Sequence, residues 1–165
     1  MSSGASPQEQ IIEAARRNNV ELLASVAESQ SDKLAEVVNG AKDATGNTAL
    51  HLCCKYGCYE VLDKLLDIDG VEVDPVHPLT GDTPLHYAVN YSFEEPEYAK
   101  FLVETLLDVG ADPTIRNKDG LKPAQLLGDS NEELKLVLEG AEYASTAQLQ
   151  QDEEEDVDDG PSDEE

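Results

Sequence analysis

The chain has 165 residues, of which 36 are acidic and 11 are basic, giving a formal net charge of −25. Such a chain repels phosphate backbones and anionic lipid surfaces, so we expect neither a direct nucleic-acid partner nor a membrane partner. Hydrophobic residues make up 39% and aromatic residues 5%, which suffices for one modest core. No apolar run approaches the roughly 20 residues that span a bilayer.

The first helix is predicted to begin at Pro7. Ser6 and Glu9 have the spacing of a capping box, and Pro7 fits the first helical position. Residues 1–6 are small and polar, so we expect a flexible N-terminus without a signal peptide. A second apolar segment at 20–26 completes a helix pair, and residues 33–38 could add a short helix.

Two six-residue segments are nearly identical. Residues 46–51 read Gly-Asn-Thr-Ala-Leu-His, residues 81–86 read Gly-Asp-Thr-Pro-Leu-His, and a degraded third copy occupies 120–125. In each, glycine allows a tight turn, and in the first two threonine can cap the helix that follows. Apolar residues at helical spacing and then turn signals follow the first two copies. The sequence therefore predicts repeated helix pairs with a period near 35 residues.

This pattern resembles the ankyrin repeat, whose period is about 33 residues and whose signature is Thr-Pro-Leu-His. The resemblance covers about residues 8–140. It implies an all-α repeat solenoid of about four ankyrin repeats, which are helix pairs with β-hairpin fingers, and degenerate capping repeats at both ends. It also implies that His51 and His86 tie helix starts to neighbouring backbone.

Domain boundaries follow from this resemblance and from the charge pattern. We assign residues 7–141 to the ankyrin-repeat domain and 142–165 to a disordered acidic tail. Residues 152–165 hold ten acids, no base and one aliphatic residue, which is too little to bury. The tail either contacts a client or only keeps the protein soluble.

Two departures from the family pattern are visible. Gly110 follows His86 by 24 residues, where the family has about 18, and the extra segment near 92–98 is rich in acids and aromatics. It is either a tolerated surface insertion or a partner contact. At the finger position where the family keeps an aspartate, the chain has Asp43, Pro78 and Asn117. These substitutions leave hydrogen bonding between fingers open.

Three cysteines lie within six residues, Cys53, Cys54 and Cys58. An odd number so closely spaced is no disulfide framework and indicates a reducing compartment, so we expect a cytoplasmic or nuclear location. Zinc needs four ligands and there is no second cysteine pair. Packing of Cys53 and Cys54 where ankyrin repeats place alanines is favoured over redox sensing or metal binding, with Cys58 more exposed.

Nothing in the sequence has the spacing of a catalytic triad, a phosphate-binding loop or a zinc-protease helix. We therefore expect no enzyme, no cofactor and no metal. The resemblance instead implies protein binding by a concave surface of finger tips and first-helix ends. Its candidate partner-binding residues are Asp43, Thr45, Asn47, Lys55, Tyr56, Leu79, Asp82, Asn90, Tyr91, Arg116 and Lys118.

The acidic charge narrows the expected partner. Residues 11–14 and 112–118 resemble small fungal ankyrin proteins with acidic tails, one of which escorts a small-subunit ribosomal protein. We expect a monomeric escort or chaperone for a basic client, such as a ribosomal protein, using the concave face and the acidic tail. The alternative is a regulatory adaptor or inhibitor that docks a folded signalling, transcriptional or degradation partner.

Overall fold

The computed structural model describes the backbone of residues 5–159 and the side chains of residues 5–147. Within this part of the chain the only strand-like pairing is one isolated bridge between Lys42 and Thr48. None of its helices is both long and apolar enough to cross a membrane. The helices are α1 (Pro7–Arg17), α2 (Val20–Ser29), α3 (Leu34–Gly40), α4 (Ala49–Tyr56), α5 (Tyr59–Leu66), α6 (Pro84–Tyr91), α7 (Pro96–Asp108), the 3₁₀ helix η1 (Pro123–Leu127) and α8 (Glu132–Asp159).

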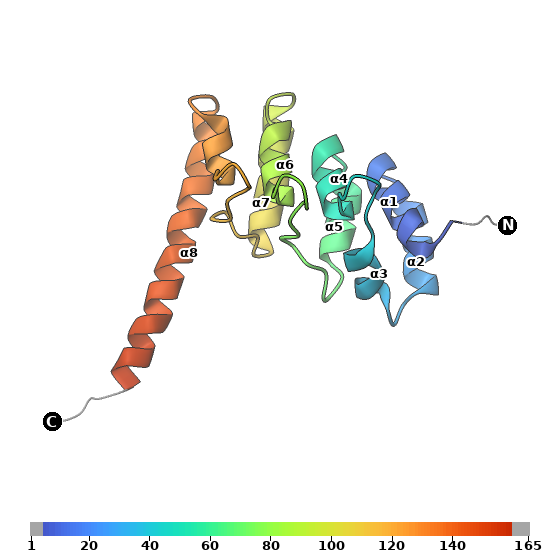
Figure 1. Ribbon diagram of the computed structural model, residues 1–165, viewed down its shortest axis with the longest axis horizontal. Helices are drawn as coiled ribbons and strands as arrows, with labels where there is room; N and C mark the ends of the chain where they lie inside the picture. Colours follow the sequence, from blue (N-terminus) through green and yellow to red (C-terminus); the bar gives the residue numbers. More distant parts are fainter. Residues whose placement is uncertain (1–4, 160–165) are drawn as a thin grey trace.

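The helices stack as four antiparallel pairs in chain order (Figure 1). The inner helices α1, α4, α6 and η1 pack one against the next, while α2, α5, α7 and α8 form an outer row. This arrangement confirms the predicted all-α repeat solenoid. The short helix α3, which the sequence allowed at 33–38, precedes the first finger.

The two signature histidines hold neighbouring repeats together. His51 is fully buried, and its Nδ1 accepts a hydrogen bond of 3.2 Å from the Thr48 N–H. Its Nε2 therefore carries the proton and donates to the Asp82 carbonyl of the next repeat at 2.8 Å. His86 repeats the arrangement with Thr83 and with the Leu121 carbonyl at 2.9 Å. The tie that the resemblance implied is thus present twice.

Burial explains why these two imidazole rings are uncharged. Desolvation lowers the pKa of His51 to about 4, against the smaller opposing effect of its hydrogen bond to Asp82. Desolvation also lowers the pKa of His86. Both rings are therefore neutral at pH 7, as a ring with one accepting and one donating nitrogen must be.

All three cysteines lie in the core. Cys53 and Cys54 are fully buried, as predicted, and Cys58, which we expected to be more exposed than these two, is more exposed by a few per cent only and is buried as well. Cys58 is only 6% exposed because the α4–α5 turn packs against α1, which brings its Sγ to 3.9 Å from the Arg16 carbonyl oxygen. Burial raises the pKa of all three thiols, which keeps them protonated and poorly reactive.

The extra segment of the third pair is partly helical. α6 ends at Tyr91, residues 92–95 form a loop, and α7 begins at Pro96. α7 has 13 residues where α5 has 8, so part of the insertion lengthens the outer helix. The loop lies at the upper end of α6 and α7 in Figure 1.

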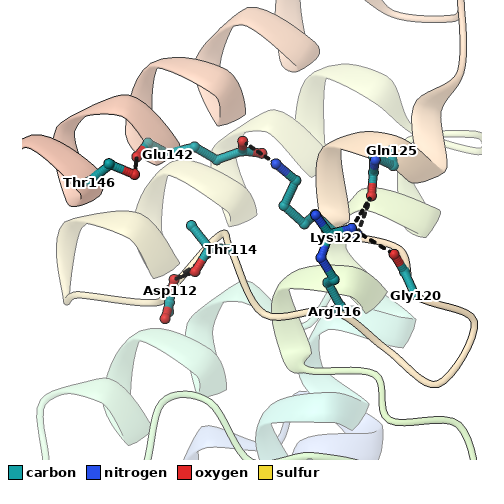
Figure 2. Close-up of polar contacts among 8 residues, drawn as sticks. All are labelled: Asp112, Thr114, Arg116, Gly120, Lys122, Gln125, Glu142 and Thr146. Carbon is teal, nitrogen blue, oxygen red and sulfur yellow. Dashed lines mark hydrogen bonds and ion pairs between the residues drawn. The ribbon is translucent and has the colours of Figure 1, made fainter.

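The last helix continues past the predicted domain boundary at residue 141. Lys122 Nζ lies 2.8 Å from Glu142 Oε1, and Thr146 Oγ1 donates to the Glu142 carbonyl at 3.0 Å (Figure 2). Contacts with the repeat domain therefore include Glu142, which the sequence placed in the tail. Residues 1–4 and 160–165 of the predicted flexible ends lie outside the described residues.

Candidate protein-binding surface

Three fingers project from the inner helices, at residues 42–47, 77–82 and 116–121. We call the surface formed by these fingers and by α1, α4, α6 and η1 the finger face. Gly46 and Gly81 have φ of 105° and 77°, which side-chain-bearing residues rarely adopt. Each finger is a tight turn closed by a backbone hydrogen bond, and finger 1 also has the isolated antiparallel bridge between Lys42 and Thr48.

Finger 1 is organised by Asp43. Its Oδ1 accepts hydrogen bonds from the N–H groups of Thr45, Gly46 and Asn47, and its Oδ2 accepts from Asn47 Nδ2. Partial burial alone would raise the pKa of Asp43, but these bonds outweigh it and lower the pKa to about 2. Asp43 therefore stabilises the turn, and little of its acceptor capacity is left for a partner.

Asn47 is buried, although the sequence placed it among the partner-binding residues. It is 4% exposed, and its Oδ1 accepts a 2.6 Å hydrogen bond from Tyr87 Oη on α6. Its side chain links finger 1 to the next inner helix. The sequence pattern showed that Asn47 belongs to a finger, but only the packing of α6 shows that this side chain points inward.

Fingers 2 and 3 are hydrogen-bonded to each other in spite of their departures from the family pattern. Asn117 Nδ2 donates to Asp82 Oδ1 at 2.9 Å, and the Lys118 N–H donates to the Thr80 carbonyl at 2.9 Å. Lys118 Nζ also donates to the Pro78 carbonyl at 2.6 Å. Asp82, like Asp43, is thus partly engaged within the fingers.

The remaining candidates present side chains to solvent. Leu79 is 72% exposed at the tip of finger 2, and Tyr56 is 47% exposed at the end of α4. Lys55 is exposed and its Nζ stands 5.6 Å from the centre of the Tyr56 ring. The other exposed candidates are Thr45, Asn90, Arg116 and Lys118, and Arg116 donates to the Gly120 carbonyl at 2.8 Å (Figure 2).

A hollow of about 250 Å³ lies between α4 and the end of α6. Three candidates meet there, Lys55, Asn90 and Tyr91, together with Tyr87 and Glu94, which were not among the residues predicted to bind a partner. Glu94 lies in the insertion near 92–98, and this position was the sequence signal that could have identified it. Tyr87 follows the signature histidine directly, and nothing in the pattern indicated that it lines a cavity.

Tyr91 forms one wall of this hollow and is half-buried. A Cβ added to Gly57 would lie 2.5 Å from its Oη, so the phenol packs directly over the α4–α5 turn. Burial, and then the nearby Glu95 and Glu94 carboxylates, raise the pKa of Tyr91. The hollow thus offers an aromatic wall, an ammonium group, an amide and a carboxylate, which suits recognition of a side chain.

No group of three histidine, cysteine, aspartate or glutamate side chains in the described part of the chain could hold a metal ion. The hollow contains tyrosines, a lysine, an asparagine and a glutamate, and none of these is a serine, cysteine or histidine of the kind that acts as a paired nucleophile and base. What the arrangement offers is hydrogen bonding, charge and apolar contact.

Comparison with known proteins agrees with the geometry. A family model described as "Ankyrin repeats (3 copies)" matches residues 11–117. The chain is 50% identical over 171 aligned positions to ankyrin repeat-containing protein YGL242C of Saccharomyces cerevisiae, covering 98% of this chain and 94% of that protein. It is 30% identical over 83 positions to putative ankyrin repeat protein L371 of Acanthamoeba polyphaga mimivirus, covering 48% of this chain and 10% of that protein.

Proposed function

This chain belongs to the ankyrin-repeat family of protein-binding modules, and we propose that it escorts a basic protein client, such as a ribosomal protein. The observation that carries the proposal is the charge of the chain, −25 over 165 residues. A surface of one sign attracts a partner of the opposite sign, speeds its capture and suppresses its contacts with nucleic acid.

The acids that would attract such a client gather on the outer helices and in the tail. Helices α2, α5 and α7 contain seven acids and two bases, and residues 152–165 contain ten acids and no base. All seven of these acids are exposed. One of the two bases, Lys100, is already paired with Glu133 at 2.7 Å. From the sequence we expected the concave face and the tail to hold this client, but the positions of these acids favour the outer helices and the tail for its basic part.

Affinity purification of the full chain at low and moderate salt tests the proposal. We expect one basic protein to be enriched, with recovery falling steeply between about 50 and 300 mM salt because exposed charges are screened. A variant with every acid of residues 152–165 changed to its amide should recover several-fold less. Recovery of a non-basic partner, equal in both forms and at both salt concentrations, would contradict the escort proposal.

A regulatory adaptor or inhibitor is the second candidate, and the hollow beside Tyr91 favours it. A partner docked there would depend on apolar contact more than on long-range charge, because aromatic anchors dominate such interfaces. Its capture should survive moderate salt and amidation of the tail. Tyr91→Ala, in the wall of the hollow, should weaken that capture about tenfold, whereas Tyr143→Ala, at an exposed tyrosine of α8, should leave it unchanged.

We further propose that the chain acts without catalysing a reaction, as a monomer in the cytoplasm or nucleus. Members of the ankyrin-repeat family are typically binding modules, and both ends of the array have capping helix pairs. Sedimentation equilibrium at micromolar concentrations should give the mass of one chain.

A further inference from the structure

Charge is unevenly divided between the faces of this molecule. The three fingers and the inner helices α1, α4, α6 and η1 contain six of the 11 bases but only five of the 36 acids. The rest of the chain carries five bases and 31 acids. The finger face, where repeat arrays dock their partners, is therefore nearly balanced in charge, although the chain as a whole is strongly acidic.

Four bases of the finger face have no ion-pair partner among the described residues: Lys42, Lys55, Arg116 and Lys118. All four are exposed. Arg116 and Lys118 donate to the carbonyl oxygens of Gly120 and Pro78, which are neutral groups and leave the positive charges uncompensated. These side chains are available to pair with carboxylates.

The acids of the fingers are less available than the bases. Asp43 accepts hydrogen bonds from its own turn, and Asp82 accepts one from Asn117 of finger 3. Both are partly buried, and of the finger acids only Asp119 is exposed. The exposed charged side chains that a docking partner meets at the fingers are therefore three bases, Lys42, Arg116 and Lys118, and one acid, Asp119.

Apolar side chains stand among these bases. Leu79, at 72% exposure, occupies the tip of finger 2, next to finger 3 with its Arg116 and Lys118. Tyr56, at 47% exposure, lies beside Lys55. Exposed apolar groups of this size, flanked by unpaired cations, form a surface that suits an apolar side chain with carboxylates on either side of it.

We infer that the finger face takes an acidic segment of a partner protein. Its carboxylates face Lys42, Lys55, Arg116 and Lys118, and its apolar side chains lie against Leu79 and Tyr56. Glu94, at the rim of the hollow, keeps this segment on the finger side of Tyr91. The inference uses a different surface from the escort proposal, which assigns basic clients to the outer helices and the tail.

Fluorescence anisotropy of the full chain at about 150 mM salt tests the inference. The probe is a labelled peptide of twelve residues in which glutamates alternate with leucines around one tyrosine. A second peptide has lysine in place of each glutamate. We expect the acidic peptide to bind. Lys42→Glu with Lys55→Glu should weaken it about tenfold, because attractive charge pairs become repulsive.

The matched control is Lys33→Glu with Lys64→Glu, which makes the same change in net charge at two exposed lysines outside the finger face. It should change the affinity of the acidic peptide less than twofold. Leu79→Ser, at the exposed tip of finger 2, should weaken binding about fivefold without altering the melting temperature.

Three results would overturn the inference. The acidic peptide could fail to bind the wild-type chain, or both lysine pairs could weaken it equally, which would show a general field effect. A synthetic peptide of residues 152–165 could also displace the probe at a much lower concentration than the unlabelled probe itself. The face would then belong to this chain's own tail. None of these results bears on capture of a basic client, which the affinity purification tests separately.

Discussion

The junction between fingers 1 and 2 is built differently from the junction between fingers 2 and 3. At the first, the Gly46 turn lies against the ring of Pro78, and His51 supplies the hydrogen bond to finger 2. At the second, backbone and side chains join the fingers directly, through Lys118 to Thr80 and Asn117 to Asp82. Both junctions therefore contain the signature histidine. Apolar packing adds to it at the first junction, and a hydrogen-bond network adds to it at the second.

This difference follows from the residue at one position. Proline at 78 has no N–H and no polar side chain, so finger 2 cannot form the aspartate-centred turn seen at Asp43. His77 takes over part of that role, because its Nδ1 accepts from the Leu79 N–H at 3.1 Å. The buried signature histidine, which both junctions share, should then dominate the stability of both.

The largest expected effect comes from replacing the signature histidine, which is His51 at the first junction and His86 at the second. His51→Ala or His86→Ala removes a buried ring, the helix cap and the bond to the next finger, which together should cost about 4 kcal/mol. Urea denaturation followed by circular dichroism measures it. A loss below about 1 kcal/mol in either variant would show that the two junctions do not share this support.

Acid should break both junctions through the same two rings. Because the pKa of His51 is lowered to about 4, its contribution to stability is fully present above the ordinary value of 6.5 and is lost as pH falls towards 4. The magnitude is about 3 kcal/mol, and His86 acts in the same direction.

One carboxyl opposes this trend. Burial raises the pKa of Asp74 to about 6, so ionisation of Asp74 costs stability above pH 6, and that cost disappears as pH falls towards 4. Urea midpoints measured from pH 7.5 to 4.5 should nevertheless decrease, since two rings outweigh one carboxyl. A midpoint that rises throughout this range would contradict the neutral, buried state of the histidines.

Replacing the turn glycines with alanine should distinguish the two junctions, because the loss of stability should differ between them. A Cβ on Gly81 would lie 2.7 Å from the backbone nitrogen of Lys118, so Gly81→Ala should cost about 3 kcal/mol. A Cβ on Gly46 would lie 2.7 Å from Cγ of Pro78 and 3.6 Å from Nε2 of His77, and a change of ring pucker can relieve part of the closer contact, so the cost should be nearer 2 kcal/mol. Gly120→Ala meets nothing within 4 Å and controls for positive φ alone, at about 1 kcal/mol. Equal losses in all three, by urea denaturation, would mean that the junctions do not differ.

The smallest effect should come from the exposed bond across the second junction. Lys118→Met keeps most of the side chain and removes the hydrogen bond to the Pro78 carbonyl, so it should cost less than about 1 kcal/mol. Lys64→Met on α5 is the matched control and should be neutral. A loss above 2 kcal/mol would make this bond a main support of the junction.

The sequence predicted the repeats and their helix pairs, because these depend on local signals that recur after 35 and then 39 residues. The resemblance to the family implied the histidine ties. The sequence did not predict the burial of Asn47 or Cys58, since each faces a neighbouring repeat whose position depends on stacking. It also left open whether the fingers are hydrogen-bonded to each other, because Pro78 and Asn117 stand where the family pattern has aspartate. In the structure His77 takes over part of that role beside Pro78, whereas Asn117 itself bonds to Asp82.

The candidate surface was predicted in part. Exposure of Tyr56, Leu79 and the finger bases follows from their places at helix ends and turn tips. The hollow beside Tyr91 and the segregation of charge between the two faces could not be predicted. Both depend on how helices from different repeats lie side by side, which no single repeat contains.

Amide hydrogen exchange of the full chain, with and without the acidic peptide used as the anisotropy probe, tests most directly whether the finger face docks proteins. We expect exchange to slow in fingers 1, 2 and 3 and at the ends of α4 and α6. A basic client recovered by affinity purification should instead slow exchange in α2, α5 and α7. Slowing by the acidic peptide that is confined to the outer helices, with all three fingers unchanged, would contradict the assignment of the finger face as a docking surface.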